Sequence, residues 1–252
     1  MTRRILLEVA YDGTAYHGYA FQEGADTIEG RLNQAISELE GRPAAVIGAS
    51  RTDAGVHAHK NLAVFDTEHR MDAGNFRPAL NVRLPEDIRI RASREVSPGF
   101  HPRKVRTEKT YVYRILNTGE KDPMQRLYAL YVAYPLDEAR MQEGAGYLLG
   151  EHDFRSFCSA HTQAQTTVRE ITGIRVERAG EEIRITVRGL GFLYNMVRII
   201  TGTLLEIGRG AMEPSRVGEI LAACDRTLAG PTVPPQGLVL EDIRILDYFN
   251  NA

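Results

Sequence analysis

The sequence has few cysteines, no long apolar run and almost no net charge, and each lack excludes a class of protein. Its two cysteines, Cys158 and Cys224, match neither a disulfide framework nor a metal site, so we expect reduced thiols in a cytoplasmic protein. No stretch approaches the roughly 20 apolar residues that span a bilayer. Glu8 interrupts the apolar run near the N-terminus, which argues against a signal peptide, and we expect no membrane association. The formal net charge of −2 excludes a generally basic coat, so any contact with nucleic acid needs a local basic patch.

The residues that are present indicate a compact α+β protein. With 43% hydrophobic and 25% charged residues, a chain of 252 residues can bury one large core or two modest ones. In the first half, the spacing of apolar residues predicts the order β-α-β-β-α-β, which is a split βαβ unit. The expected strands are 5–11, 44–47, 62–65 and 88–96, and the expected helices are 27–39, capped by Asp26 or Thr27, and 75–82.

The second half is expected to repeat this order of elements, although no sequence repeat is detectable. Strands are expected at 110–116, 128–134, 167–178, 181–188 and 238–246, and helices at 136–149, 194–207 and 214–224. The predicted fold is therefore α+β, with two similar split-βαβ (ferredoxin-like) domains that have antiparallel sheets. We place the domains at residues 1–104 and 105–252.

Residues 48–58, GASRTDAGVHA, predict a tight loop that carries Arg51 and Asp53. Small residues allow the backbone to turn sharply and to approach a ligand closely. A nearby guanidinium lowers the pKa of a carboxyl group and keeps it ionised, as a carboxylate nucleophile requires. The alternative is an ordinary Asx-turn, in which Asp53 bonds backbone N–H groups and Arg51 is solvated. Local chemistry alone favours the turn.

The same segment resembles the catalytic loop of the tRNA pseudouridine synthase A (TruA) family, whose usual form is GAGRTDAGVHA. Ser50 stands where the family pattern has glycine, whereas Arg51, Thr52 and Asp53 match it. A match over this length is far more specific than a short glycine motif. The resemblance implies that Asp53 is the catalytic nucleophile. It also implies that Arg51 contacts phosphate and occupies the space that the target base leaves.

A basic segment follows at residues 83–109. It holds eight Lys or Arg (83, 89, 91, 94, 103, 104, 106 and 109) against four acids (86, 87, 95 and 108), with aromatic residues interleaved. This mixture suits RNA, because phosphates attract cations and unstacked bases pack on aromatic faces. A solvated linker between domains explains the composition equally well. Residues 100–117, FHPRKVRTEKTYVYRILN, resemble the family's F-H-A-R and K/R-x-Y-x-Y pattern, which implies that Tyr111 packs against the target base, with Pro102 as a departure.

Residues 189–205, GLGFLYNMVRIITGTLL, predict an apolar helix that contains one charged residue, Arg198. A buried arginine needs an anion, because an uncompensated charge costs several kcal/mol. The alternative is an arginine that extends to solvent along the helix. The run resembles the family's G-x-G-F-L-Y-H-M-V-R-x-I-x-G-x-L, in which the arginine pairs with the catalytic aspartate, and Asn195 stands where histidine is common. We therefore predict that Arg198 contacts Asp53 within about 4 Å.

Two further stretches fit the same family. Residues 150–158, GEHDFRSFC, resemble its G-x-H-D-F-x-x-F-C run, and PPQGLVLEDI near the C-terminus resembles its A-P-x-x-G-L-x-L. The second match implies that Leu240 lines the pocket for the base. One His–Asp dipeptide is far short of a metal-ligand set, so we expect His152 and Asp153 to pin a turn.

The resemblance implies an isomerase that converts uridine to pseudouridine at positions 38, 39 and 40, in the anticodon stem-loop of tRNA. The implied site is a central RNA-binding cleft on a continuous surface formed by the two sheets. The target base must be flipped out of its stack at a cost of a few kcal/mol. The reaction needs no cofactor or metal, and members of the family are homodimers. No residue decides whether Asp53 attacks C1′ of the ribose or C6 of the uracil.

Two other functions are open to the sequence. A non-catalytic RNA-binding module would use the same cleft, although it has no use for a carboxylate beside phosphates. A glycosidase-like hydrolase would use Asp53 with Glu151 or Asp153 as its acid, and it predicts two carboxyl groups about 5–9.5 Å apart in one pocket. The set of Arg51, Asp53 and Arg198 favours the synthase.

Overall fold

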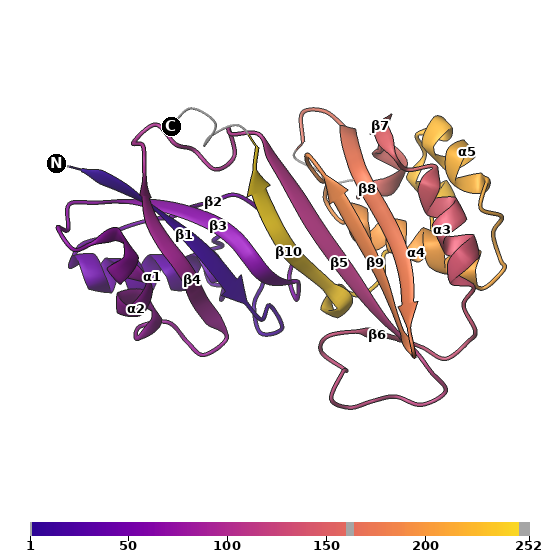
Figure 1. Ribbon diagram of the computed structural model, residues 1–252, viewed down its shortest axis with the longest axis horizontal. Helices are drawn as coiled ribbons and strands as arrows, with labels where there is room; N and C mark the ends of the chain where they lie inside the picture. The colour runs from indigo at the N-terminus through magenta and orange to yellow at the C-terminus, as the bar shows by residue number, and fades with distance from the viewer. Residues whose placement is uncertain (1, 160–163, 247–252) are drawn as a thin grey trace. The chain divides into compact units, whose positions relative to one another are not determined.

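The computed structural model describes residues 2–159 and 164–246, and they form an α+β fold with mostly antiparallel strands and few helices (Figure 1). The α+β class predicted from the sequence is confirmed at this level. The described chain divides into two compact units: unit 1 holds residues 2–107 and 240–246, and unit 2 holds residues 108–239. Compactness alone does not define an independently folding domain, so the domains at 1–104 and 105–252 stay a prediction.

Unit 1 is built on a sheet in which β1 lies between β3 and β4, and both pairings are antiparallel. Two further strands, β2 and β10, pair with β3. Helix α2 packs on this sheet through the rings of Phe65 and Phe76, whose centroids are 5.4 Å apart. The elements are β1 (Arg3–Tyr11), α1 (Ile28–Glu40), β2 (Ile47–Gly48), β3 (His57–Thr67), η1 (Ala73–Asn75), α2 (Phe76–Asn81), β4 (Ile88–Val96) and β10 (Leu238–Ile245).

The strands of unit 2 pair in the order β5-β9-β8-β7, and β6 runs parallel to the end of β5. On β9, buried Ile183, Ile185 and Val187 alternate with half-buried or exposed polar residues, so the sheet has one core face. The elements are β5 (Thr107–Asn117), β6 (Leu130–Val132), α3 (Glu138–Gly146), β7 (Gly150–Asp153), η2 (Arg155–Phe157), β8 (Val168–Ala179), β9 (Glu182–Gly189), α4 (Met196–Gly208), α5 (Arg216–Ala223), η3 (Arg226–Leu228) and η4 (Pro235–Gly237).

The cap expected at Thr27 is confirmed, and helix α3 is capped in the same way. Thr27 precedes α1, and its hydroxyl accepts a hydrogen bond from Gly30 N at 3.2 Å. Asp137 precedes α3, and its carboxylate accepts from Arg140 N at 3.0 Å. Both side chains satisfy an N–H group that the first helical turn leaves without a backbone partner.

For two of the strands that differ from the expectation, the structure gives a physical reason. The strand expected at 44–47 shrinks to β2, because the side chains of α1 take its backbone groups: Val46 N donates to Asn33 Oδ1 at 2.8 Å and Ala44 N to Ser37 Oγ at 2.9 Å. Strand β7 was not expected, because its sequence GEHD is polar and half-buried or exposed throughout, so it carries no alternation.

Among the described residues, the helices are all too short or too polar to cross a membrane. The longest of them have 13 residues, fewer than the roughly 20 that a spanning helix needs.

Candidate active site

The loop that carries Asp53 runs from residue 49 to residue 56, between β2 and β3 of unit 1. The two strands pair antiparallel, with Gly48 opposite Ala63, so strands of the same sheet hold both ends of the loop. Asp53 is half-buried in this loop and Arg51 is exposed. Both ends of the loop are therefore anchored in the sheet, which restricts the position of Asp53.

Asn61 on β3 clamps the loop before Arg51. The side chain is fully buried, its Oδ1 accepts from Ser50 N at 3.2 Å, and its Nδ2 donates to Ser50 O at 2.9 Å. One amide thus bonds both backbone groups of one residue, as a neighbouring strand would. Ser50, the departure from the family pattern, is buried and has both of its backbone groups paired.

Thr52 is held on the other side of Arg51. Its hydroxyl shares a hydrogen bond of 2.8 Å with the Tyr11 hydroxyl, and its carbonyl accepts from Tyr19 N at 3.0 Å. The Asn61 amide also donates to the Tyr11 hydroxyl at 3.2 Å, which links the two clamps. The residues on both sides of Arg51 are therefore fixed, and so is the backbone that leads to Asp53.

Two glycines of the segment 12–19 let the chain pass directly beneath this loop. At Gly13 a Cβ atom would lie 2.0 Å from Val56 O. Gly18 has φ +92 and approaches the Thr52 carbonyl, where a Cβ atom would lie 2.9 Å from the oxygen. Only glycine fits such contacts, so the segment 12–19 forms the floor of the Asp53 loop.

Tyr19 packs under the same loop with its hydroxyl buried. A Cβ atom on Gly48 would lie 2.2 Å from its ring, so the ring fills the space that this glycine leaves. In the part of the chain that the structure describes, the Tyr19 hydroxyl has no hydrogen-bond partner, and burial raises its pKa well above the usual value. Burial of this hydroxyl costs free energy, because it removes the hydrogen bonds to water without a replacement among the described residues.

Replacing Tyr19 with phenylalanine should leave the free energy of unfolding unchanged or raise it by about 1 kcal/mol, because the ring stays and the unpaired hydroxyl goes. The matched control is Tyr113→Phe. The Tyr113 hydroxyl is also largely buried but donates to Pro234 O at 2.7 Å, so its removal should cost about 1 kcal/mol. Urea unfolding of both variants checks this. Equal destabilisation by the two substitutions would contradict it.

The basic segment 83–109 spans β4 and the start of β5, and some of its cations bond backbone oxygens. Arg103 Nε donates to Gly48 O at 2.7 Å, which ties the segment to the start of the Asp53 loop. Arg83 donates to Ala79 O at 2.6 Å. Binding of RNA by this segment stays a prediction.

In unit 2, Arg198 lies in the first turn of α4 and is half-buried. Its Nε donates to Val233 O and its Nη1 donates to Asn195 Oδ1, each at 2.7 Å. Asn195 has a left-handed backbone with φ 60, and its Nδ2 donates to Ser159 Oγ at 2.9 Å. Protein oxygens on two segments therefore fix the direction of the guanidinium.

Tyr111 lies on β5 of unit 2 and is only 7% exposed. Its ring meets the edge of Phe192 with centroids 4.9 Å apart, and its backbone pairs with Val187 on β9. Leu240, on β10, is fully buried. The structure thus places Arg51 and Asp53 on one loop of unit 1 and Tyr111 in unit 2.

The expected contact between Arg198 and Asp53 joins residues of different units and stays a prediction. The roles expected for Arg51, Asp53, Tyr111 and Arg198 stay predictions as well.

One of the two candidate acids of the hydrolase alternative, Asp153, does not fit the role of a general acid. A hydrogen bond from Thr167 holds the pKa of Asp153 below its usual value, and the carboxylate also accepts from Arg155 N at 3.0 Å. A general acid needs a raised pKa instead. His152 bonds Leu149 O at 2.8 Å, so His152 and Asp153 pin turns as expected. Groups of three or more metal-binding side chains do not occur within residues 2–159 and 164–246.

Several residues that shape the site were not identified from the sequence: Tyr11, Tyr19 and Asn61. Asn61 gave a usable signal, since it is a polar residue directly before the apolar run LAVF of β3. A buried amide is rare unless its groups are paired, so such a position indicates a structural hydrogen-bond network.

Comparisons with known proteins agree on one family. A family model described as tRNA pseudouridine synthase matches residues 8–103 and 145–244. The chain is 44% identical over 241 residues to tRNA pseudouridine synthase A of Brevibacillus brevis, which covers 96% of this chain and 99% of that protein. It is 45% identical over 237 residues to tRNA pseudouridine synthase A of Syntrophomonas wolfei, covering 94% and 95%.

Among solved structures, an H/ACA RNP bound to a substrate RNA containing 2'-deoxyuridine aligns at a TM-score of 0.35 and 12% identity. The alignment covers 80% of this chain and 53% of that one. A likeness of this size supports no argument about fold or function.

Proposed function

The chain belongs to the tRNA pseudouridine synthase family, and on this premise we propose that it isomerises uridine to pseudouridine in tRNA. The proposed targets are positions 38, 39 and 40 of the anticodon stem-loop. The observation that carries the proposal is the GASRTDAGVHA loop. In this loop, buried hydrogen bonds hold Ser50 and Thr52 in place just before Asp53. A preorganised carboxylate is what nucleophilic catalysis requires.

In the proposed reaction the N1–C1′ bond of the target uridine breaks, the uracil rotates, and its C5 forms a new bond to C1′. The hydrogen on C5 leaves as a proton and N1 gains a proton, so there is no net oxidation. Asp53 supplies the nucleophile. The base reacts only after it has flipped out of the anticodon stack, which costs a few kcal/mol.

The other proposed roles follow the residues that match the family. Arg51, exposed on the loop, contacts phosphate and takes the space of the flipped base. Tyr111 packs on the uracil, and Arg198 keeps Asp53 ionised. We further propose that the two units are similar split-βαβ domains that form a central cleft for RNA, and that two copies of the chain form a homodimer in the cytoplasm.

Release of tritium from tRNA labelled at C5 of uridine tests the proposal, because pseudouridine formation displaces that hydrogen. The substrate is an unmodified tRNA transcript with uridine at position 39. A matched transcript with cytidine at positions 38, 39 and 40 should give no release above background. Equal release from both transcripts would contradict the target positions, and no release from either would contradict the function.

Replacing Arg198 with methionine should lower kcat about a hundredfold, because it removes the cation proposed for Asp53 while keeping most of the side-chain volume. The control is Arg209→Met, at the end of the same helix, where the arginine is exposed and pairs with Glu206. Its turnover should match that of the wild type. Multiple-turnover tritium release with saturating tRNA, at a temperature where both variants are folded, measures the difference. Equal turnover in the two variants would remove Arg198 from the site.

A further inference from the structure

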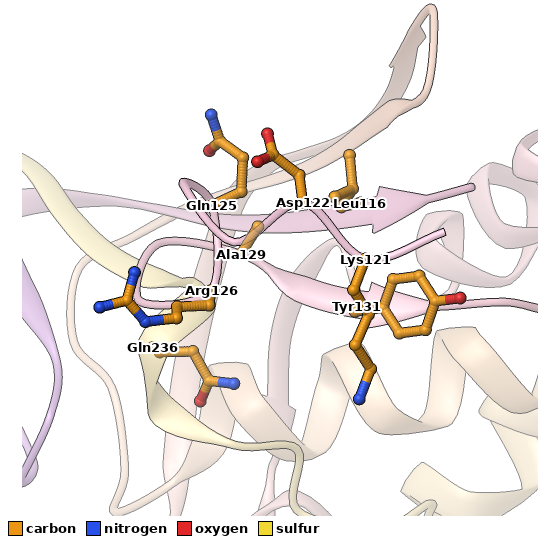
Figure 2. A pocket seen from close by; sticks show the side chains of 8 residues that line it. All are labelled: Leu116, Lys121, Asp122, Gln125, Arg126, Ala129, Tyr131 and Gln236. Atoms are coloured by element: carbon orange, nitrogen blue, oxygen red, sulfur yellow. The ribbon is translucent and has the colours of Figure 1, made fainter. Parts of the chain in front are cut away.

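A pocket of about 180 Å³ lies in unit 2, at the end of β5 and under the loop that leads to β6. Leu116, Ala129 and Tyr131 give it apolar walls, and Lys121, Gln125 and Arg126 add polar groups. Figure 2 shows Arg126 on one side of the hollow and Lys121 beside Tyr131 on the other. A hollow of this size takes a fragment such as one nucleotide unit rather than a drug-sized ligand.

The two cations of the pocket have no carboxylate partner among the described residues. Lys121 Nζ lies 5.5 Å from the centre of the Tyr131 ring. Arg126 Nη1 donates to Pro123 O at 2.7 Å, which leaves the rest of its guanidinium without a protein acceptor in the described chain. Both side chains are exposed.

Most arginines of the same unit do pair with a carboxylate. Arg114 pairs with Glu182 at 2.9 Å, and this ion pair lowers the pKa of Glu182 to about 2. The one acid of the pocket, Asp122, accepts a hydrogen bond from Met124 N at 2.8 Å and so closes its own turn. The pocket therefore contains two positively charged side chains and one carboxylate, and that carboxylate already bonds the backbone of its own loop.

An amide adds hydrogen-bonding groups beside these cations. Gln125 Oε1 accepts from Arg114 Nη2 at 3.2 Å, which directs the oxygen toward β5 and sets the orientation of its NH₂ group. Cations, an amide donor and short apolar walls together match a phosphate with its ribose. A carboxylate ligand would not need the amide or the walls.

We propose that this pocket binds one phosphate and its ribose in the backbone of the tRNA substrate, at a place separate from the target uridine. Lys121 and Arg126 contact the phosphate, and Gln125 bonds the 2′-hydroxyl. The identity of the RNA rests on the proposed function, whereas the anion site rests on the pocket alone. Leu116 follows Tyr111 by five residues on β5, so the pocket lies roughly 17 Å along the strand from the proposed base contact. One RNA backbone can reach both places.

The test is the salt dependence of tRNA binding by the full chain, measured by fluorescence anisotropy with a labelled tRNA transcript. Lys121→Gln with Arg126→Gln should raise Kd about tenfold at about 0.1 M salt. It should also make the slope of log Kd against log salt shallower by about one, since one phosphate contact is lost. The charge-conserving pair Lys121→Arg with Arg126→Lys should keep the wild-type slope.

The matched control is Arg140→Gln with Arg216→Gln, which removes two positive charges from helices α3 and α5 of the same unit. If the pocket variant and this control share the wild-type Kd and slope, the proposal is overturned. If the two variants weaken binding equally, net charge explains the effect and the proposal is again overturned. Failure of the proposed function is a separate result, because it shows as absent tritium release by the wild-type chain.

Discussion

Asp53→Asn is expected to abolish tritium release while the chain still binds tRNA. The substitution keeps the size and most of the hydrogen bonding of the side chain but removes the negative charge of the nucleophile. The buried clamps on Ser50 and Thr52 use the backbone and the threonine hydroxyl, so the loop should keep its shape. We expect turnover to fall by on the order of 10³ or more.

The control for this variant is Asp66→Asn, at the end of β3 in the same unit. Asp66 pairs with Arg4 at 2.7 Å, and that pair lowers its pKa, so its replacement should cost some stability but no turnover. Stopped assays with saturating tRNA give turnover, and anisotropy gives Kd. Near-normal release by Asp53→Asn would show that another group is the nucleophile.

The positions of the regular elements could be predicted from the sequence where burial is one-sided. Strand β4 was expected at 88–96 and has those bounds, because its apolar residues mark the core side. Helix α1 was expected from residue 27, because a capping threonine precedes a 3.6-residue repeat. Elements whose two faces do not differ in polarity, such as the polar strand β7, could not be predicted from the pattern of apolar residues.

The residues of the Asp53 loop could be found by resemblance, but their supports could not. Tyr11 lies 41 residues before Thr52, and 50 residues separate it from Asn61. These three side chains meet only because β1 pairs with β3, with Tyr11 opposite Ala58. A pattern in one segment carries no information on the register between two strands, so the network needed the structure.

Gly202→Ala should produce the largest loss of stability among the substitutions considered for unit 2. Gly202 lies in the middle of α4, and a Cβ atom there would lie 1.8 Å from Pro231 O. The neighbouring segment is equally close, since a Cβ atom on Gly230 would lie 2.5 Å from Thr203 N. The helix and the segment 230–231 are thus in backbone contact, which no rotamer change can relieve.

Replacing glycine with alanine inside a helix normally raises stability by about 1 kcal/mol. A loss of stability in Gly202→Ala would therefore report the packing clash and not helix propensity. We expect the clash to outweigh the helix propensity of alanine, so that Gly202→Ala lowers the free energy of unfolding by about 3 kcal/mol or more. The control is Gly146→Ala at the end of α3, where a Cβ atom would meet nothing within 4 Å. There alanine should raise stability by about 0.5–1 kcal/mol.

Gly202→Ala should also disturb the proposed site. The segment that Gly202 contacts continues to Val233, and the Val233 carbonyl accepts a hydrogen bond from Arg198 Nε at 2.7 Å. The Thr203 hydroxyl fastens this segment as well, since it accepts from Gly230 N at 2.9 Å. Moving the segment away from α4 would withdraw one of the oxygens that direct the guanidinium. Gly202→Ala should therefore lower tritium release even at temperatures where urea titration shows the chain to be folded, and Gly146→Ala should not. A Gly202→Ala protein with wild-type stability and turnover would mean that the segment 230–233 can shift without moving Arg198.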